Sequence, residues 1–395
     1  MQYRIISSDD HVTEPADLFV RRLSNTLQNR APRVKQFNGE DRWVVGDKIV
    51  SPTGAARTNL KTPHEKRAPH PPATYQTCEP GIWRPEPRLK DYDADGIDAA
   101  VLFPDFFPGF AGNPFWSLGE DFELRLACIK AWNVWLIDEF CAVNRARLIP
   151  LCLLPAWSVE ESIKELQRCA KKGCTGIIWG GVLDIFGLPT LFDSHWDPVW
   201  AAAQDANMVI CMHQQSALLD RRTAARPNGW TADDRKNLPG LYEAMTTWHA
   251  SSSIMPLVEV ICSGMLQRFP QLKVFFGEAG VGWIPYAIEQ ADFFWKRNKS
   301  WDNSPLTMPP SHYWRRQCAA GFWYERIDSY IIDQLGEDNI MFEADYPHQI
   351  TDNGINRGSQ GYIDTSLARV TDAQVRHKAL AGNAVRFFGL ERYQQ

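Results

Sequence analysis

Acidic and histidine side chains stand at the ends of apolar runs that lie far apart in this 395-residue sequence. Near the N-terminus, the stretch S-S-D-D-H-V-T-E-P contains Asp9 and His11, and later apolar runs end in His213, Glu278 and Asp345. A buried carboxylate is stable only when it is paired or bound to a metal ion. Two imidazoles with three carboxylates form a ligand set for zinc, manganese or iron. We therefore interpret these side chains as candidate ligands of a divalent metal ion.

Each of these residues also has a structural explanation when it is considered alone. Asp9 could cap a turn, and a lone His213 is more often a hydrogen-bonded core residue than a ligand. Glu278 before Ala-Gly could begin the next helix, and Asp345 before Tyr-Pro could occupy a turn. Four separate strands that all end in ligand-type residues are harder to explain in this way, so together they favour a metal site.

Two further histidines leave the number of ions open. His249 opens a predicted helix, and His348 lies three residues after Asp345. Either could face the candidate ligands and, with Glu278, hold a second ion, because two-metal sites share a bridging carboxylate. Alternatively, His348 contacts substrate and His249 only starts its helix. The sequence thus predicts one or two divalent ions, and His249 is also a candidate catalytic residue.

The elements that must position these residues are short apolar runs that alternate with longer amphipathic ones. Eight runs are strand candidates, at 3–8, 99–104, 148–155, 176–180, 208–213, 272–278, 317–323 and 339–345. Continuous apolar runs indicate strands covered on both faces, as in parallel sheets. Eight such strands with helices between them predict a (β/α)8 TIM barrel, with an open doubly wound sheet as the alternative. In a barrel, all strand C-termini meet on one face, where the candidate ligands would converge.

Two irregular stretches interrupt the alternation within a single domain that spans residues 1–395. Residues 20–90 are rich in Pro, Arg and Lys and contain a predicted hairpin at Arg42–Val50. We interpret this stretch as an insertion after the first strand that packs over the barrel mouth. Residues 214–250 follow the fifth strand and are long enough to form a lid.

Aromatic and basic residues near the predicted mouth are candidates for substrate binding. Trp179, Trp283 and Phe106 could line an aromatic pocket for a small organic molecule, and Arg221 could bind a carboxylate. Core packing explains the tryptophans equally well, and an arginine in a long loop is more often solvated. The sequence does not specify the substrate.

Composition narrows the class of protein. The net charge of −5 and the lack of a long basic run argue against a nucleic-acid-binding protein. No apolar stretch approaches the ~20 residues that a membrane span needs, and no secretory signal is visible at the N-terminus. The nine cysteines are scattered without any C-x-x-C pair, which is typical of reduced thiols. We expect a cytoplasmic protein.

Several motifs together carry a resemblance to a known family. In order along the chain they are S-S-D-D-H-V-T-E-P, D-Y-D-A-D-G-I-D-A-A-V-L-F-P, R-L-I-P-L-C-L-L-P, C-M-H, F-F-G-E-A-G-V-G-W-I-P, E-A-D-Y-P-H and G-N-A-V-R-F-F-G-L. The series resembles the amidohydrolase superfamily, in the branch with the aminocarboxymuconate-semialdehyde and γ-resorcylate decarboxylases. This resemblance implies a distorted TIM barrel with a metal at the strand ends, and often a homodimer.

The resemblance also assigns roles to individual residues. The family's first-strand H-x-H motif corresponds to Asp9 and His11, its fifth-strand ligand to His213 and its eighth-strand aspartate to Asp345. In the family that aspartate accepts a proton from metal-bound water, so Asp345 is expected to be both ligand and general base. The sixth strand usually ends in a catalytic histidine, but here it ends in Glu278, which is then a metal ligand or an acid/base.

Four functions are consistent with these residues. The first is hydrolysis of an amide, ester, thioester or lactone by metal-activated water. The second is non-oxidative decarboxylation of an aromatic or unsaturated acid, which the replacement of the histidine by Glu278 makes less expected. The third is a dinuclear iron or iron–manganese oxygenase. The fourth is an inactive structural partner of an active paralogue, in a hetero-oligomer.

Overall fold

The computed structural model describes residues 2–37, 39–52, 74–76, 78–105, 121–214, 238–241, 243–244, 247, 251–300, 302–348 and 358–394. Within these ranges, no helix is long and apolar enough to cross a lipid bilayer.

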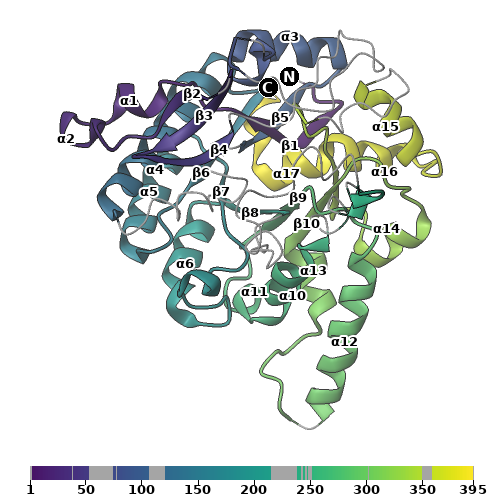
Figure 1. Cartoon of the computed structure of the whole chain (residues 1–395). Helices are drawn as coiled ribbons and strands as arrows, with labels where there is room; N and C mark the ends of the chain where they lie inside the picture. Colours follow the sequence, from purple (N-terminus) through teal and green to yellow (C-terminus); the bar gives the residue numbers. More distant parts are fainter. Residues whose placement is uncertain are drawn as a thin grey trace.

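Eight parallel strands form a nearly closed barrel with helices between them (Figure 1). The strands are β1 (Ile6–Val12), β5 (Ala99–Pro104), β6 (Leu148–Leu153), β7 (Gly176–Ile178), β8 (Val209–His213), β9 (Val274–Gly277), β10 (Cys318–Phe322) and β11 (Ile340–Phe342). They pair in this order along the sheet. Each pair of neighbours is parallel. The predicted (β/α)8 barrel is therefore confirmed.

Hydrogen bonds between the two ends of the sheet bring β1 next to β11. Ser8 Oγ donates to Phe342 O over 3.0 Å. Beyond the end of β11, Asp345 N donates to Asp9 O over 2.9 Å and His11 N donates to Tyr346 O over 2.6 Å. These bonds lie at the carboxyl ends of the strands, so the seam of the barrel coincides with the candidate ligands.

The strands are buried along their whole length, as their continuous apolar runs predict. Every residue of the eight barrel strands is buried. One face of each strand fills the barrel interior and the other packs against the surrounding helices, which is the general arrangement of this fold. Asp9, His11 and His213 are polar residues within these buried strands, and they are candidate metal ligands.

The helices match the amphipathic runs of the sequence closely. The barrel helices with defined ends include α3 (Pro85–Asp95), α4 (Phe122–Trp135), α5 (Val159–Lys171), α6 (Asp197–Asp205), α10 (Ile254–Cys262), α11 (Met265–Arg268), α12 (Ile284–Ser300), α13 (Pro310–Gln317) and α14 (Ser329–Leu335). Helices α10 and α11 are separated by Gly264, whose φ of +79° a non-glycine residue rarely adopts. Helix α12 projects away from the barrel (Figure 1). The chain ends in α15 (Gly358–Ser366), α16 (Ala373–His377) and α17 (Asn383–Phe388).

The segment after β1 forms a small separate sheet. Two short helices, α1 (Leu18–Arg22) and α2 (Asn25–Gln28), precede the antiparallel strands β2 (Arg33–Phe37), β3 (Glu40–Val45) and β4 (Lys48–Pro52). The predicted hairpin is present as β3 and β4, joined by a turn with Gly46 at φ +59°. Residues 53–73 lie outside the described ranges, as does most of the predicted lid at 214–250. That the insertion and the lid cover the barrel mouth therefore stays a prediction.

Candidate metal centre

The carboxyl ends of four strands bring the sequence-predicted ligands together. Asp9 and His11 lie on β1 and His213 is the last residue of β8. Glu278 directly follows β9, and Asp345 follows β11 by three residues. All five are buried, with exposed fractions of 0–7%.

Asp9 connects the two histidines of the first ligand set. Asp9 Oδ1 lies 3.5 Å from His11 Nε2, and Asp9 Oδ2 lies 3.1 Å from His213 Nε2. The ligand atoms of these three residues all lie within 4.8 Å of one another. Since ligand bonds to zinc-like ions are about 2.0–2.2 Å long, ligands of one ion are about 3–4 Å apart. Asp9, His11 and His213 thus have the spacing that a single ion requires.

Hydrogen bonds on the far side of each ring orient both imidazoles toward the site. His11 Nδ1 lies 2.7 Å from Pro104 O, and His213 Nδ1 lies 3.0 Å from Gln214 O. A carbonyl can only accept, so each Nδ1 carries a proton and each Nε2 is the nitrogen that faces Asp9. Outer hydrogen bonds of this kind are typical of metal-binding histidines.

The Asp9 carboxylate tests whether the residues present fit a cation. Both of its oxygens are buried and accept no hydrogen bond from any residue that the structure describes. A carboxylate removed from water without donors is costly unless a cation binds it. Gly277 makes room for this group, because a Cβ there would lie 2.3 Å from Asp9 Oδ2. The donor set and its surroundings therefore fit a divalent ion.

A second set of ligand atoms overlaps the first. It consists of His11, Glu278, Asp345 and His348, again within 4.8 Å of one another. Asp345 Oδ1 lies 3.2 Å from His11 Nε2 and accepts a hydrogen bond of 2.7 Å from His348 Nδ1. Glu278 Oε2 lies 3.3 Å from His213 Nε2. The ring of His348 lies over that of His11, with centroids 4.2 Å apart.

Burial and mutual charge push the pKa values of neighbouring groups apart. Burial raises the pKa of Glu278 to about 8, with help from the charge of Asp345 and against His213. Burial lowers the pKa of His213, but Asp9 and Glu278 outweigh it and raise that pKa to about 9. Burial also raises the pKa of Asp345, but His348 and His11 outweigh it and lower that pKa to about 2. Without a cation, bound protons therefore offset the negative charges of these buried carboxylates. A bound cation would take the place of those protons.

The backbone at Glu278 and Asp345 adopts an unusual conformation. Their φ angles are +47° and +54°, in the left-handed region that residues with side chains seldom occupy. Asp345 N donates to Asp9 O, and Glu278 N donates to a carboxylate oxygen of Glu343 over 3.1 Å. Such strained conformations cluster at functional sites.

Two buried carboxylates at the site were missed by the sequence analysis. Asp105 directly follows β5, and its Oδ1 lies 3.7 Å from His348 Nε2, while its other oxygen accepts from Thr13 Oγ1. The strand-end rule that found the other ligands could have found Asp105. Glu343 fits beside β10 only because residue 321 is glycine, since a Cβ there would lie 1.7 Å from Glu343 Oε2. No sequence pattern indicates this contact.

A buried network supports the first strand from behind. Asp10 accepts hydrogen bonds from Ser7 Oγ over 2.7 Å and from Tyr92 Oη over 2.6 Å. The guanidinium of Arg88, itself 0% exposed, donates to His11 O over 2.5 Å. Burial raises the pKa of Asp10 to about 7, although Arg88 opposes this shift. The backbone that carries Asp9 and His11 is therefore held on its outer side.

The remaining predicted residues are distributed less simply. His249, Phe106 and Arg221 lie outside the described ranges. Trp179 is 1% exposed and packs against two tryptophans of the core, with ring centroids 4.8 and 5.0 Å away. Trp283 is half-buried and donates to Ala279 O over 2.8 Å. Their contact with substrate stays a prediction.

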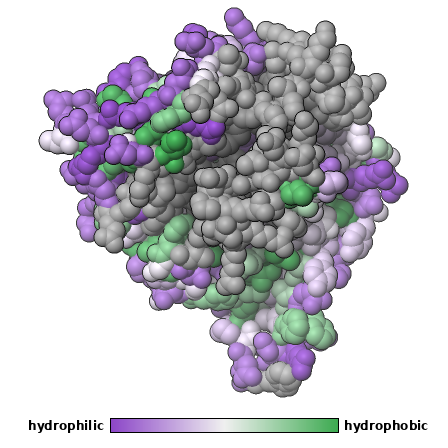
Figure 2. Space-filling model, viewed as in Figure 1, coloured by the Kyte–Doolittle hydropathy of each residue, from purple (hydrophilic) through white to green (hydrophobic). Residues whose placement is uncertain are grey.

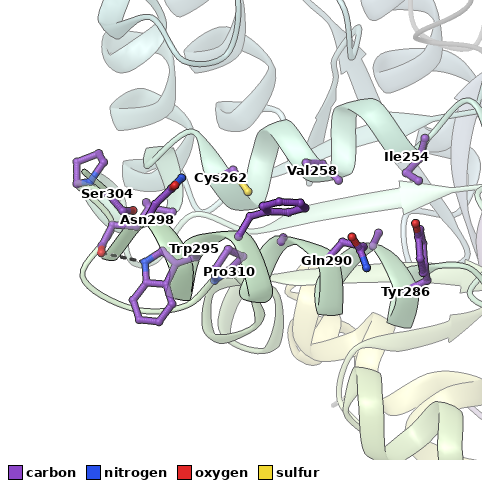
Figure 3. A pocket seen from close by; sticks show the side chains of 14 residues that line it. Ile254, Val258, Cys262, Tyr286, Gln290, Trp295, Asn298, Ser304 and Pro310 are labelled. Atoms are coloured by element: carbon purple, nitrogen blue, oxygen red, sulfur yellow. Dashed lines mark hydrogen bonds between the residues drawn. The ribbon is translucent and has the colours of Figure 1, made fainter. Parts of the chain in front are cut away.

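A groove elsewhere on the molecule is separate from these ligands. It lies between α10 and α12, has a volume of about 510 Å³, and is lined by residues such as Val258, Cys262 and Trp295 (Figure 3). None of the candidate ligands lines it. Hydrophobic residues are also visible on the surface near α12 (Figure 2), where Tyr286 and Phe293 are 62% and 58% exposed. The groove does not share the chemistry of the strand ends.

Comparisons with known proteins agree with the fold. A family model described as amidohydrolase matches residues 63–390. A 2-amino-3-carboxymuconate-6-semialdehyde decarboxylase from Dictyostelium discoideum is 23% identical over 329 residues, which is 80% of each chain.

Solved structures share the whole fold at low sequence identity. An amidohydrolase from Mycobacterium avium subsp. paratuberculosis K-10 has a TM-score of 0.72 at 20% identity, over 98% of both chains. A dihydroxybenzoic acid decarboxylase from Polaromonas sp. JS666, with bound manganese and the inhibitor 2-nitroresorcinol, has a TM-score of 0.59 at 15% identity. That alignment covers 99% of this chain and 98% of the other.

Proposed function

The chain belongs to the amidohydrolase family, and from this membership we propose that it is a metal-dependent decarboxylase. Its substrate is a small aromatic or unsaturated carboxylic acid, from which it removes carbon dioxide without oxidation. The observation that carries the proposal is the buried ligand cluster of Asp9, His11, His213 and Asp345 at the strand ends. Related proteins with a named activity, from Dictyostelium and Polaromonas, are decarboxylases.

Decarboxylation takes the place of the hydrolysis that the sequence alone ranked first. The same ligands could activate water in either enzyme, so the ligand set does not separate the two reactions. The related decarboxylases favour the second of the four functions over the first. Glu278 stands where the resemblance predicts a histidine. We do not assign the proton transfer to Glu278.

Asp9, His11, His213 and Asp345 would hold the ion. We favour manganese because the related Polaromonas enzyme contains it. When bound, the ion supplies a positive charge that binds the substrate's carboxylate or an adjacent hydroxyl and stabilises the negative charge that develops as carbon dioxide leaves. The outer hydrogen bonds of His11 and His213 keep both rings in place for this purpose.

Asp345 and His348 form the pair that delivers the proton. The bond between the ring or alkene carbon and the carboxyl group breaks, and its electron pair stays on that carbon. His348 Nδ1 carries a proton that it donates to Asp345 Oδ1 over 2.7 Å, and Asp345 passes this proton to the carbon. Both groups are at least nine-tenths buried, so bulk water is kept from the reacting carbon.

We predict that Asp345→Asn lowers the rate of carbon dioxide release by about 10²–10⁴-fold, because the amide cannot transfer the proton. Carbon dioxide release would be measured with manganese-loaded protein and a panel of hydroxybenzoates and unsaturated dicarboxylic semialdehydes. His195→Asn, an exposed histidine on the helical turn Ser194–Trp196, is the control and keeps full activity.

Other outcomes of the same assay would contradict the proposal. Ester or lactone hydrolysis without carbon dioxide release would indicate that the protein is a hydrolase. Oxygen uptake would indicate the oxygenase. A manganese-loaded protein that is inactive in every assay would favour the structural partner.

A further inference from the structure

Helix α12 projects away from the barrel and exposes aromatic side chains (Figure 1). None of its residues from Glu289 to Ser300 is buried. Tyr286, Phe293 and Phe294 are 62%, 58% and 51% exposed, and no other helix or strand in the described ranges has as many exposed large hydrophobic side chains. A surface helix normally turns its apolar side chains toward the core. Exposed aromatic side chains on a projecting helix therefore indicate a contact with another molecule.

Two of these aromatic residues belong to one line of side chains along the helix, which we call the α12 stripe. It consists of Tyr286, Glu289, Phe293, Lys296 and Ser300, which follow one another at alternating spacings of three and four residues. All five residues are exposed. Residues at these spacings lie on the same face of an α-helix, and they form the contact line when two helices pack side by side.

The charges of α12 are divided at Phe293. The part of the helix before Phe293 has two acidic residues and no basic one, whereas the part after it has three basic residues and no acidic one. Exposed Glu289 lies in the first part, and exposed Lys296 and Arg297 lie in the second. The helix dipole favours the same order of charges, but it does not account for the exposed aromatic rings between them.

This order of charges makes α12 complementary to a second copy of itself in antiparallel orientation. A two-fold axis at Phe293 places each residue opposite the one that lies equally far on the other side of Phe293 in the second copy. Phe293 then packs against Phe293 of the second copy. Glu289 lies opposite Arg297 of the second copy and beside its Lys296. A parallel pair would instead place like charges next to each other, so the charges favour the antiparallel pair.

We propose that the α12 stripe is a contact surface between two copies of this chain, whose α12 helices pack antiparallel about a two-fold axis at Phe293. The resemblance to the amidohydrolase superfamily leads us to expect a dimer but does not say which surface forms it. Tyr286 of the stripe also lines the groove between α10 and α12, so the contact borders that groove (Figure 3). None of the candidate metal ligands lies on α12, and the contact is therefore independent of the proposed decarboxylase.

Phe293→Asp tests the centre of the contact. Sedimentation velocity of the full chain over a wide range of concentrations would measure the Kd of the dimer, and we expect wild-type protein to reach twice the 45.0 kDa mass of one chain. The substitution changes both sides of a two-fold contact, so a tenfold weakening per residue raises the Kd about 100-fold. Phe192→Asp, which replaces a 55% exposed phenylalanine outside α12, is the control and keeps the wild-type Kd.

Reversal of charges tests the antiparallel orientation. Glu289→Lys alone, and Lys296→Glu combined with Arg297→Glu, each place like charges opposite one another and should raise the Kd about tenfold. A mixture of these two proteins has opposite charges on both sides of the axis, and it should form dimers with nearly the wild-type Kd. A parallel pair already has like charges together, so neither change alone would weaken it.

Wild-type protein that stays at the mass of one chain at every concentration would overturn the proposal. A dimer whose Kd is no more affected by Phe293→Asp than by Phe192→Asp would also overturn it, because the contact would then lie elsewhere. Charge-reversed proteins that each bind as tightly as wild type, or that do not recover when mixed, would overturn the antiparallel pairing. These measurements need neither metal nor substrate, so the decarboxylase can fail without affecting them.

Discussion

At the scale of single residues, the chemistry of the site depends on carboxylates that lack ordinary partners. Asp9 is fully buried, and its two oxygens face the Nε2 atoms of His11 and His213. Without a cation, these charges are balanced by protons. The pKa of His213 reflects this balance. Burial lowers that pKa, but the negative charges of Asp9 and Glu278 outweigh burial and raise it to about 9.

Metal affinity should consequently increase with pH. Near neutral pH, the metal-free protein keeps a proton on His213, whose pKa is about 9, and the ion must displace it. If one proton is released, the Kd for Mn²⁺ falls about tenfold for each unit of pH between roughly 6 and 8. Calorimetric titrations with Mn²⁺ in buffers of different ionisation enthalpy would measure the proton count. A Kd that is unchanged over this range would contradict the assignment of His213 as a ligand.

At the scale of the elements, the strand ends place the ligands, and glycines on neighbouring strands make room for them. Gly277 at the end of β9 lies against Asp9, and Gly321 on β10 lies against Glu343. A Cβ at either glycine would overlap a carboxylate oxygen, at 2.3 and 1.7 Å respectively. Asp9 and Glu343 can therefore occupy their positions only because the neighbouring residues, Gly277 and Gly321, have no side chain.

Gly277→Ala should weaken manganese binding by about 10–100-fold, because the new methyl group displaces the Asp9 carboxylate from its position between the histidines. The matched control is Gly282→Ala, five residues further on, where the nearest atom to a new Cβ is 3.8 Å away. Titration of both variants with Mn²⁺ measures the effect. Equal affinities in the two variants would show that Asp9 does not bind the metal.

At the scale of the whole molecule, a buried arginine joins distant segments behind the site. The Arg88 guanidinium donates to the carbonyl oxygens of Gly81, His11 and Ile82. It also lies 4.2 Å from the ring centroid of Tyr346, which follows β11. Helix α3, the first strand and the last strand therefore meet at one side chain. The opposite sides of the barrel seam are linked in this way.

Arg88→Met should lower the free energy of unfolding by about 3–5 kcal/mol, because Asp10 and three carbonyl oxygens stay buried without the guanidinium. Urea-induced unfolding of the metal-free protein measures the change. Arg369→Met removes an exposed arginine, 3.8 Å from Asp328, and should change the unfolding free energy by less than about 1 kcal/mol. A loss in Arg88→Met no larger than in this control would contradict the role of the network.

Much of the barrel and the first ligands were predictable from the sequence because both depend on local information. Continuous apolar runs indicate buried parallel strands, and the polar residue that ends each run must lie at the barrel face where the strands finish. This is why Asp9, His11, His213, Glu278 and Asp345 could be named together. The same rule also applies to Asp105 after β5.

Only the tertiary structure decided how these groups are arranged relative to one another. Which carboxylate faces which imidazole depends on the stagger between strands, on left-handed backbone at Glu278 and Asp345, and on the space beside Gly277 and Gly321. The position of Trp179 in the core was decided in the same way. Distances between side chains on different strands are set by the closure of the barrel, and a pattern read along one strand contains no information about them.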